Sequence, residues 1–150
     1  MSSGSYRIAL GTLYVLSLAG VVYLLHDGRA FNTDFTAFLE LLPPDGGEAL
    51  VLGAGGAARA AVAALRRRGY RVRIWNRTPE RAAALGEVDR ERRPAPVVVN
   101  TTPLEPPPAP FVLDLRYGPG IEPPAAGVGG LEFLKVQAKH QYRLFCDRGL

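Results

Sequence analysis

Cysteine, histidine and lysine are all scarce in this 150-residue sequence. The single cysteine, Cys146, excludes a disulfide or a cysteine-based metal site within these residues. His26 and His140 have no ligand-like spacing around them, so we expect no metal site. Because Lys135 and Lys139 are the only lysines, the net charge of +4 comes from scattered arginines. Such a small positive surplus is weak evidence for nucleic-acid binding, because it suits small anions such as phosphates equally well. We therefore expect no nucleic-acid partner.

Charge is also absent from the longest apolar run, residues 8–25. Its 18 residues reach the lower limit for a membrane-spanning helix, and the arginine before it would suit an export signal. The run is also rich in Val, Tyr, Leu and Ile and is interrupted by Gly11, Ser17 and Gly20, as in a pair of buried strands. We favour strands, so residues 1–30 are interpreted as a remnant N-terminal strand or hairpin, and membrane association is not expected.

Residues 31–150 alternate strand and helix signals and form the second expected unit, a Rossmann-like dinucleotide-binding domain. The composition, 47% hydrophobic and 21% charged, is that of an ordinary globular domain. Short apolar runs indicate strands covered on both faces, whereas alanine-rich or amphipathic segments indicate helices. The expected strands are 49–52, 71–75, 96–100 and 111–115, and the expected helices are 35–42, 57–68, 79–85 and 131–147.

The connections between these elements are short or irregular. Residues 86–96 are too few for both a full strand and a full helix, the proline tract 105–110 indicates an extended connector, and 118–130 is loop-like. Thr33 or Asp34 can cap the first helix. The expected buried stripe of the last helix is Leu131, Leu134, Ala138, Tyr142 and Phe145. The pattern predicts an α/β fold, with an open, mainly parallel Rossmann-like sheet, helices on both faces and abbreviated crossovers.

A glycine-rich loop follows the first of these strands and opens a helix, which is the context that a dinucleotide-binding loop requires. Gly53 permits the tight turn, and Gly55 lets the backbone approach a pyrophosphate. Gly56 and Ala57 begin the helix, whose free N–H groups would face the anion.

The end of the next strand indicates which dinucleotide is bound. NAD-binding domains place an acid there for the ribose 2′-hydroxyl, whereas this sequence has Asn76, Arg77 and Thr78 and no acid. The Arg77 guanidinium suits a phosphate, Thr78 offers a hydroxyl, and Arg81 follows one helical turn later. We therefore expect NADP as the cofactor and a cytoplasmic location.

These motifs together resemble the NADP domain of shikimate dehydrogenases. Beyond the glycine loop and the Asn-Arg-Thr triplet, the resemblance includes an Asn-Thr-Asp segment, an Asn-Thr-Thr segment, a Tyr-Gly-Pro segment and a Gly-Leu helix start that leads to Gln-Ala. It spans about residues 27–147 in the family's order. The matching segments are 27–34, 53–60, 76–82, 99–103, 113–119 and 130–138.

The resemblance implies NADP-dependent reduction of 3-dehydroshikimate or a related cyclic keto acid. Asp34 matches the acid of the family's catalytic Lys–Asp pair, although it could equally cap a helix. Asn32, Tyr117 and Gln137 match the substrate side, although Gln137 could equally be a surface amide. Three further positions match the cofactor side, of which the last lies near the nicotinamide: Asn100, Thr101 and Gly130.

The sequence also departs from the family pattern. No lysine precedes Lys135, and the family's Asn-x-Thr-x-Pro-x-Lys and Ser-x-Ser segments are not found. Since reduction of a ketone needs a proton donor, we expect an NADP-binding relative with a severely shortened substrate domain and weak or lost shikimate turnover. The alternatives are an oxidoreductase completed by a partner chain or by homodimer formation, and a membrane-anchored NADP-binding module.

Overall fold

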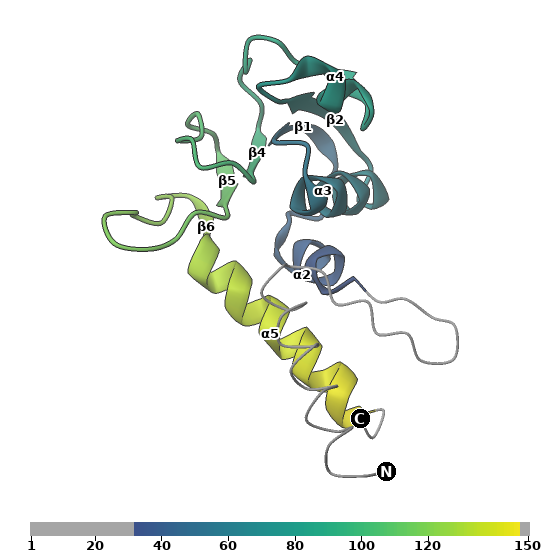
Figure 1. Ribbon diagram of the computed structural model, residues 1–150, viewed down its shortest axis with the longest axis vertical. Helices are drawn as coiled ribbons and strands as arrows, with labels where there is room; N and C mark the ends of the chain where they lie inside the picture. The colour runs from purple at the N-terminus through teal and green to yellow at the C-terminus, as the bar shows by residue number, and fades with distance from the viewer. Residues whose placement is uncertain (1–31, 148–150) are drawn as a thin grey trace.

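The computed structural model describes residues 32–147, which form a six-stranded parallel sheet with helices beside it (Figure 1). The strand order is β3-β2-β1-β4-β5-β6. The strands are β1 (Gly47–Leu52), β2 (Tyr70–Trp75), β3 (Glu87–Val88), β4 (Val97–Asn100), β5 (Phe111–Asp114) and β6 (Gly127–Gly129). The helices are α2 (Thr33–Leu41), α3 (Gly56–Arg67), α4 (Pro79–Ala83) and α5 (Gly130–Asp147). This order confirms the predicted Rossmann-like parallel sheet.

The carboxyl ends of the central strands lie level with one another. Leu52 at the end of β1 is aligned with Trp75 of β2 on one side and with Asn100 of β4 on the other. Asn100 is in turn aligned with Asp114 of β5. From β1 the chain adds β2 and β3 on one side of the sheet and then β4, β5 and β6 on the other. Open α/β sheets bind ligands outside the carboxyl ends of the strands at the point where the strand order reverses in this way. The fold therefore places the loops after β1, β2 and β4 around one location.

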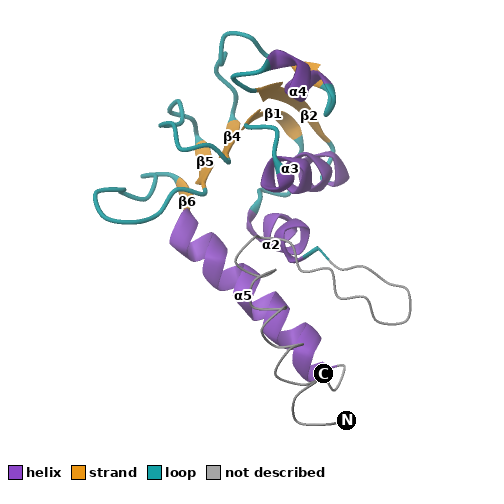
Figure 2. Ribbon diagram, in the orientation of Figure 1, coloured by secondary structure: helices purple, strands orange, loops and turns teal. Residues whose placement is uncertain are grey.

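The two faces of the sheet are covered differently. Ala49 and Val51 of β1 belong to a core cluster that also contains buried residues of all four described helices. Leu50 and Leu52 point to the opposite face, where their cluster is completed by strand residues and by loop residues such as Ala95. The core clusters thus place the described helices on one face, which differs from the predicted helices on both faces. The reason is that the connections between β3 and β4 and between β4 and β5 contain no helix. Of the described helices, α2, α3 and α5 lie together below the strands in the view of Figure 2.

An ion pair anchors the short connection between β3 and β4. Arg73 of β2 and Asp89 are both buried, and the Arg73 guanidinium donates to the Asp89 carboxylate and, at 2.8 Å, to the carbonyl oxygen of Pro94. Asp89 also accepts the backbone N–H of Glu91 at 2.9 Å. Residues 89–96 therefore cross the sheet as a tethered loop, and the predicted abbreviated crossover is confirmed.

Helix α5 packs against α2 through the side opposite to the predicted stripe. Phe133 of α5 is buried against Phe38 of α2, with ring centroids 4.6 Å apart and planes inclined at 45°. Leu131 and Tyr142 of the predicted stripe are 57% and 69% exposed, so that prediction was wrong. The buried side of α5 includes the polar Gln137, which weakens its apolar periodicity and makes the other side look more continuous.

The cap of α2 and two short strands also differ from the sequence prediction. Asn32 caps α2 by accepting the Phe35 N–H at 3.1 Å, instead of Thr33 or Asp34, which are buried. Strands β3 and β6 contain two and three residues and carry little sequence signal. In the described range 32–147 no helix has the length and apolar character needed to cross a membrane, and the apolar run 8–25 lies outside that range.

Candidate dinucleotide-binding site

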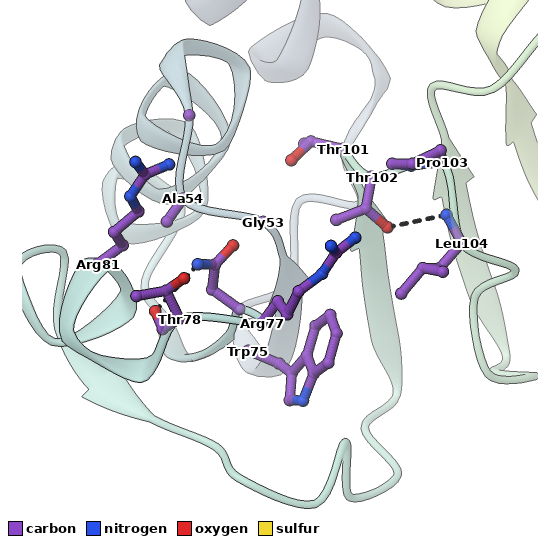
Figure 3. Close-up of a pocket in the computed structure, with 12 residues that line it drawn as sticks. Gly53, Ala54, Trp75, Arg77, Thr78, Arg81, Thr101, Thr102, Pro103 and Leu104 are labelled. Atoms are coloured by element: carbon purple, nitrogen blue, oxygen red, sulfur yellow. Dashed lines mark hydrogen bonds between the residues drawn. The ribbon is translucent and has the colours of Figure 1, made fainter.

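A cavity of about 340 Å³ opens at the carboxyl ends of β1, β2 and β4. Figure 3 shows the residues that line it, which come from the loops that follow these three strands. The β1 loop supplies Gly53, Ala54 and Gly55; the β2 end supplies Trp75, Asn76, Arg77, Thr78 and, from α4, Arg81; the β4 loop supplies Thr101, Thr102, Pro103 and Leu104. The sheet topology therefore produces a hollow where the sequence predicted a dinucleotide site.

The glycine loop is open toward this cavity. Gly53 has a positive φ of 113°, and its N–H donates to the Trp75 carbonyl at 2.8 Å. A Cβ atom on Gly53 would collide with the Thr101 hydroxyl, whereas Cβ atoms on Gly55 or Gly56 would meet no atom within 4 Å. Gly55 is the N-cap of the 12-residue α3 and has no side chain to cap its first N–H groups. Those N–H groups and the positive end of the helix dipole suit an anion.

The β2 side of the cavity is cationic. Arg77 and Arg81 both line it and are exposed, and no carboxylate is among the described residues that line it. The Asn76 side chain donates to the Thr78 carbonyl at 2.9 Å and so fixes the turn between β2 and α4. The structure thus brings two guanidinium groups into the cavity that the glycine loop also lines.

Asn100 fixes the loop after β4, which lines the cavity across from the β2 end. It is fully buried, and its amide nitrogen donates to the Leu104 carbonyl at 2.7 Å and to Asp114 at 2.9 Å. The Asn100 amide oxygen accepts hydrogen bonds from the Thr102 N–H at 3.0 Å and from the Thr102 hydroxyl at 2.8 Å. Thr101 is held by Leu52, whose carbonyl accepts both its N–H and its hydroxyl, at 3.0 and 2.7 Å. Asn100 therefore shapes the loop and does not line the cavity, whereas Thr101 does.

Two further cavities continue along the same edge of the sheet. The first, of about 330 Å³, shares Thr101 to Pro103 with the glycine-loop cavity and reaches Tyr117. The second, of about 550 Å³, shares Arg116, Tyr117 and Ile121 with the first and is bounded by Gly130 at the start of α5. The three cavities therefore lie in a row along this edge, from Arg77 to Gly130, and together they are called the trough below.

The predicted catalytic and substrate residues fall into separate groups. Asp34 and Gln137 are brought together at the α2–α5 interface, where both are buried and the Gln137 amide donates to the Asp34 carboxylate. Burial raises the pKa of Asp34 to about 6. Asn32 lies at the start of the same helix but uses its side-chain oxygen as the cap of α2. Tyr117 is 61% exposed and lies in the trough instead.

Five lining residues were not among the predicted site residues: Ala54, Trp75, Thr102, Pro103 and Leu104. Of these, Trp75 and Leu104 also lie outside the segments that carry the resemblance. Trp75 looked like the last apolar residue of a strand, and Leu104 looked like part of a proline-rich connector. The exposure of Trp75 to the cavity depends on which face of the sheet the last residue of β2 takes, and that of Leu104 depends on the conformation of the loop after β4. The sequence pattern specifies neither.

No protein-family model matches the chain. The chain is 57% identical over 67 residues to the protein named shikimate dehydrogenase (NADP(+)) of Thermus thermophilus, a match that covers 41% of this chain and 26% of that relative. It is 36% identical over 157 residues to the protein of the same name from Oleidesulfovibrio alaskensis, covering 79% and 56%. These matches support a shikimate dehydrogenase family assignment for the chain.

Solved structures of the shikimate dehydrogenase family share the fold. The crystal structure of shikimate 5-dehydrogenase from Thermus thermophilus in complex with NADP(H) and shikimate superposes with a TM-score of 0.64 at 34% identity, covering 80% of this chain and 59% of that one. The shikimate dehydrogenase of Mycobacterium tuberculosis superposes with a TM-score of 0.66 at 26% identity, covering 87% and 64%. The chain thus spans less than two thirds of the length of these relatives.

Proposed function

We propose that this chain binds NADP(H) in the trough between Arg77 and Gly130. The observation that supports this most strongly is the combination of an open glycine loop, an uncapped α3 start and two guanidinium groups in one cavity without a lining carboxylate. Backbone N–H groups would hold the diphosphate, and Arg77 with Thr78 would hold the 2′-phosphate. Arg81, one turn into α4, adds positive charge to the same side.

The nicotinamide end of the cofactor would lie toward Gly130. The trough leads there from the glycine loop, and a Cβ atom on Gly130 would collide with the carbonyls of Leu115 and Arg116. Glycine at this position therefore lets α5 begin directly against the β5 loop. The cofactor supplies hydride chemistry when bound, and this chain's own contribution would be to hold and orient it.

We further propose that the activity belongs to the reduction of 3-dehydroshikimate or a similar cyclic keto acid, with weak turnover by this chain alone. Asp34, with a pKa raised to about 6, is a protonatable group on the substrate side. It is, however, buried and bonded to Gln137, which lies seven residues and hence about 10.5 Å along α5 from Gly130. Asp34 is not among the residues that line the trough, so in this chain it is poorly placed to protonate a substrate there.

The experiment that tests cofactor binding is calorimetric titration of the full chain with NADPH and NADH. We expect NADPH to bind at least tenfold more tightly, because a guanidinium–phosphate contact contributes roughly 1.5–3 kcal/mol. Arg77→Ala is expected to reduce NADPH affinity to that of NADH, while Arg90→Ala, an exposed residue outside the cavity, leaves it unchanged. Equal affinities for the two cofactors in the unmodified chain would contradict the proposal.

The exposed side of α5 supports a second candidate, an oxidoreductase completed by another polypeptide or a second copy. Leu131, Leu134 and Tyr142 expose apolar surface along this helix, next to the cavity at Gly130. Turnover of NADPH with 3-dehydroshikimate, measured over a range of chain concentrations, distinguishes the candidates. Specific activity that rises with concentration supports completion by a second copy, and constant specific activity contradicts it.

A further inference from the structure

Helix α5 carries an apolar stripe on the side that faces away from α2. Its members are spaced three, four and four residues apart, which places them on one side of the helix, and they are Leu131, Leu134, Ala138 and Tyr142. Leu134 is 40% and Tyr142 is 69% exposed. The main contacts of α5 within the described residues are with α2 and β6, and Figure 1 shows the helix running from β6 past α2. Nothing in the described part of the chain therefore covers these four residues, which we call the α5 stripe.

One end of the α5 stripe borders the trough. Leu131 lines the cavity of about 550 Å³ at Gly130, together with Glu132. Tyr117, which is 61% exposed, lines the same cavity. Apolar surface is thus continuous from the stripe into the end of the trough. Whatever covers the stripe also reaches the trough.

The charges beside the α5 stripe favour a second α5 in the antiparallel direction. Glu132 lies near the first residue of the stripe and Arg143 near its last, and both are exposed. Antiparallel packing brings Glu132 of each copy to Arg143 of the other, whereas parallel packing sets like charges side by side. It also opposes the two helix dipoles. The charges between these ends have partners within the chain, since Lys135 contacts Glu132 at 3.6 Å and Lys139 contacts Glu40 at 3.1 Å.

The shape of the α5 stripe also suits a copy of itself. Ala138 is small and exposed, so two helices can approach closely there. Leu131 and Tyr142 are 11 residues apart, about 16 Å along the helix, so in an antiparallel pair each Tyr142 ring lies over Leu131 of the other copy. Helices paired over this length bury on the order of 1,000 Å² in total, the lower end for a specific interface. We therefore expect a weak dimer, with the chain monomeric below about 1 µM.

We propose that the α5 stripe is the interface between two copies of this chain packed antiparallel, and that Tyr142 of the second copy closes the end of the trough beside Leu131. The association goes beyond the proposed function and does not require NADP(H). The contribution to the trough rests on the proposed function. The partner is thus a second copy of this chain, and Tyr142 is the residue that it brings.

Analytical ultracentrifugation from submicromolar to several hundred micromolar chain tests the association. We expect a monomer–dimer equilibrium that Ala138→Glu weakens at least tenfold, because it sets two carboxylates against each other at the centre of the interface. The matched control is Ala63→Glu, at an exposed alanine of α3, which should leave the equilibrium unchanged. A monomer at every concentration overturns the inference, whether the stripe is then covered by another part of the chain or by a different polypeptide. A dimer that Ala138→Glu does not weaken also overturns it.

Disulfide trapping tests the antiparallel direction. Leu131→Cys chains are mixed with Tyr142→Cys chains, each in a Cys146→Ser background that removes the natural thiol and keeps a hydroxyl at that position. Antiparallel packing predicts disulfide-linked dimers in the mixture and none in either variant alone, because identical positions then lie far apart. Linked dimers in each variant alone, without any increase on mixing, would show a parallel arrangement and contradict the proposal.

NADPH separates this inference from the proposed function. If the second copy closes the trough, saturating NADPH should tighten the dimer at least threefold, because ligand binding and association are then linked. A dimer constant that NADPH binding leaves unchanged removes the role of Tyr142 in the trough. A dimer that binds no NADPH contradicts the proposed function and leaves the interface in place, and a monomer that binds NADPH does the reverse.

Discussion

The side-chain amide of Gln137 donates a hydrogen bond to the Asp34 carboxylate inside the interface between α5 and α2. The two residues are 103 positions apart, so the contact joins the helix before the sheet to the helix that follows it. Near the same interface, Glu40 of α2 contacts Lys139 at 3.1 Å and His140 at 2.7 Å. Polar residues, together with the Phe38–Phe133 contact, thus fix how α5 lies against α2.

Asp34 makes the stability of this interface depend on pH. Burial raises its pKa from an ordinary 3.8 to about 6, so the folded chain holds its proton more tightly than the unfolded chain. Its contribution is therefore fully present below pH 3.8 and is lost as the pH rises through about 6. We expect Asp34→Asn, which keeps an acceptor for Gln137, to be more stable than the unmodified chain above pH 7, by on the order of 1 kcal/mol after allowance for solvent screening.

Urea unfolding between pH 4 and pH 8 measures this effect. The difference in unfolding free energy between Asp34→Asn and the unmodified chain isolates Asp34 from the nearby Glu40–His140 contact, because that contact is present in both proteins. A difference that stays constant over the whole range would show that Asp34 does not titrate near pH 6.

The orientation of α5 predicts a large loss of stability on truncation at one position and almost none at a position two residues away. Phe133→Ala is expected to destabilise the chain by about 3–5 kcal/mol, because it empties a buried site against Phe38. Leu131→Ala, on the exposed side two residues earlier, should change stability by less than about 0.5 kcal/mol. Thermal unfolding of both variants measures the difference. Equal losses would mean that the solvent-facing side of α5 is buried in solution.

The buried pair Arg73–Asp89 predicts a third difference, with an exposed pair on the same strand as its control. Removing one member of a buried pair leaves a charge without a partner, so Arg73→Met is expected to cost about 3–5 kcal/mol. Arg71 also bridges β2 to the β3 region, contacting Glu87 at 3.1 Å, but its side chain is 66% exposed. Arg71→Met should therefore cost at most about 1 kcal/mol, as measured by urea unfolding. Similar losses in the two variants would argue that Asp89 is solvated.

Much of this fold follows from the sequence because its signals are local. The glycine loop, the buried strands β1 and β4 and the start of α4 at Pro79 each depend on a few adjacent residues, and all were located within two residues. Strand β6 was missed because it is built from Gly127 and Gly129. Glycine there allows close approach to β5, since a Cβ atom on Gly127 would collide with the Val112 backbone. The burial of one side of α5 and the exposure of Trp75 to the cavity depend on long-range packing, which local patterns do not report.

Asn100 is the residue for which the resemblance and the structure suggest different roles. The resemblance placed it beside the cofactor, whereas the structure buries it and uses its amide to fix Thr102, Leu104 and Asp114. Asn100→Ala removes the side-chain partners of the Thr102 N–H and of the Leu104 carbonyl, so we expect a loss of roughly 1–3 kcal/mol in unfolding free energy together with weaker NADPH binding. Arg77→Ala is the comparison, because it should weaken NADPH with no loss of stability. Parallel melting and NADPH titration of both variants decide the role: a stable Asn100→Ala chain with weakened NADPH binding would mean that Asn100 contacts the cofactor directly.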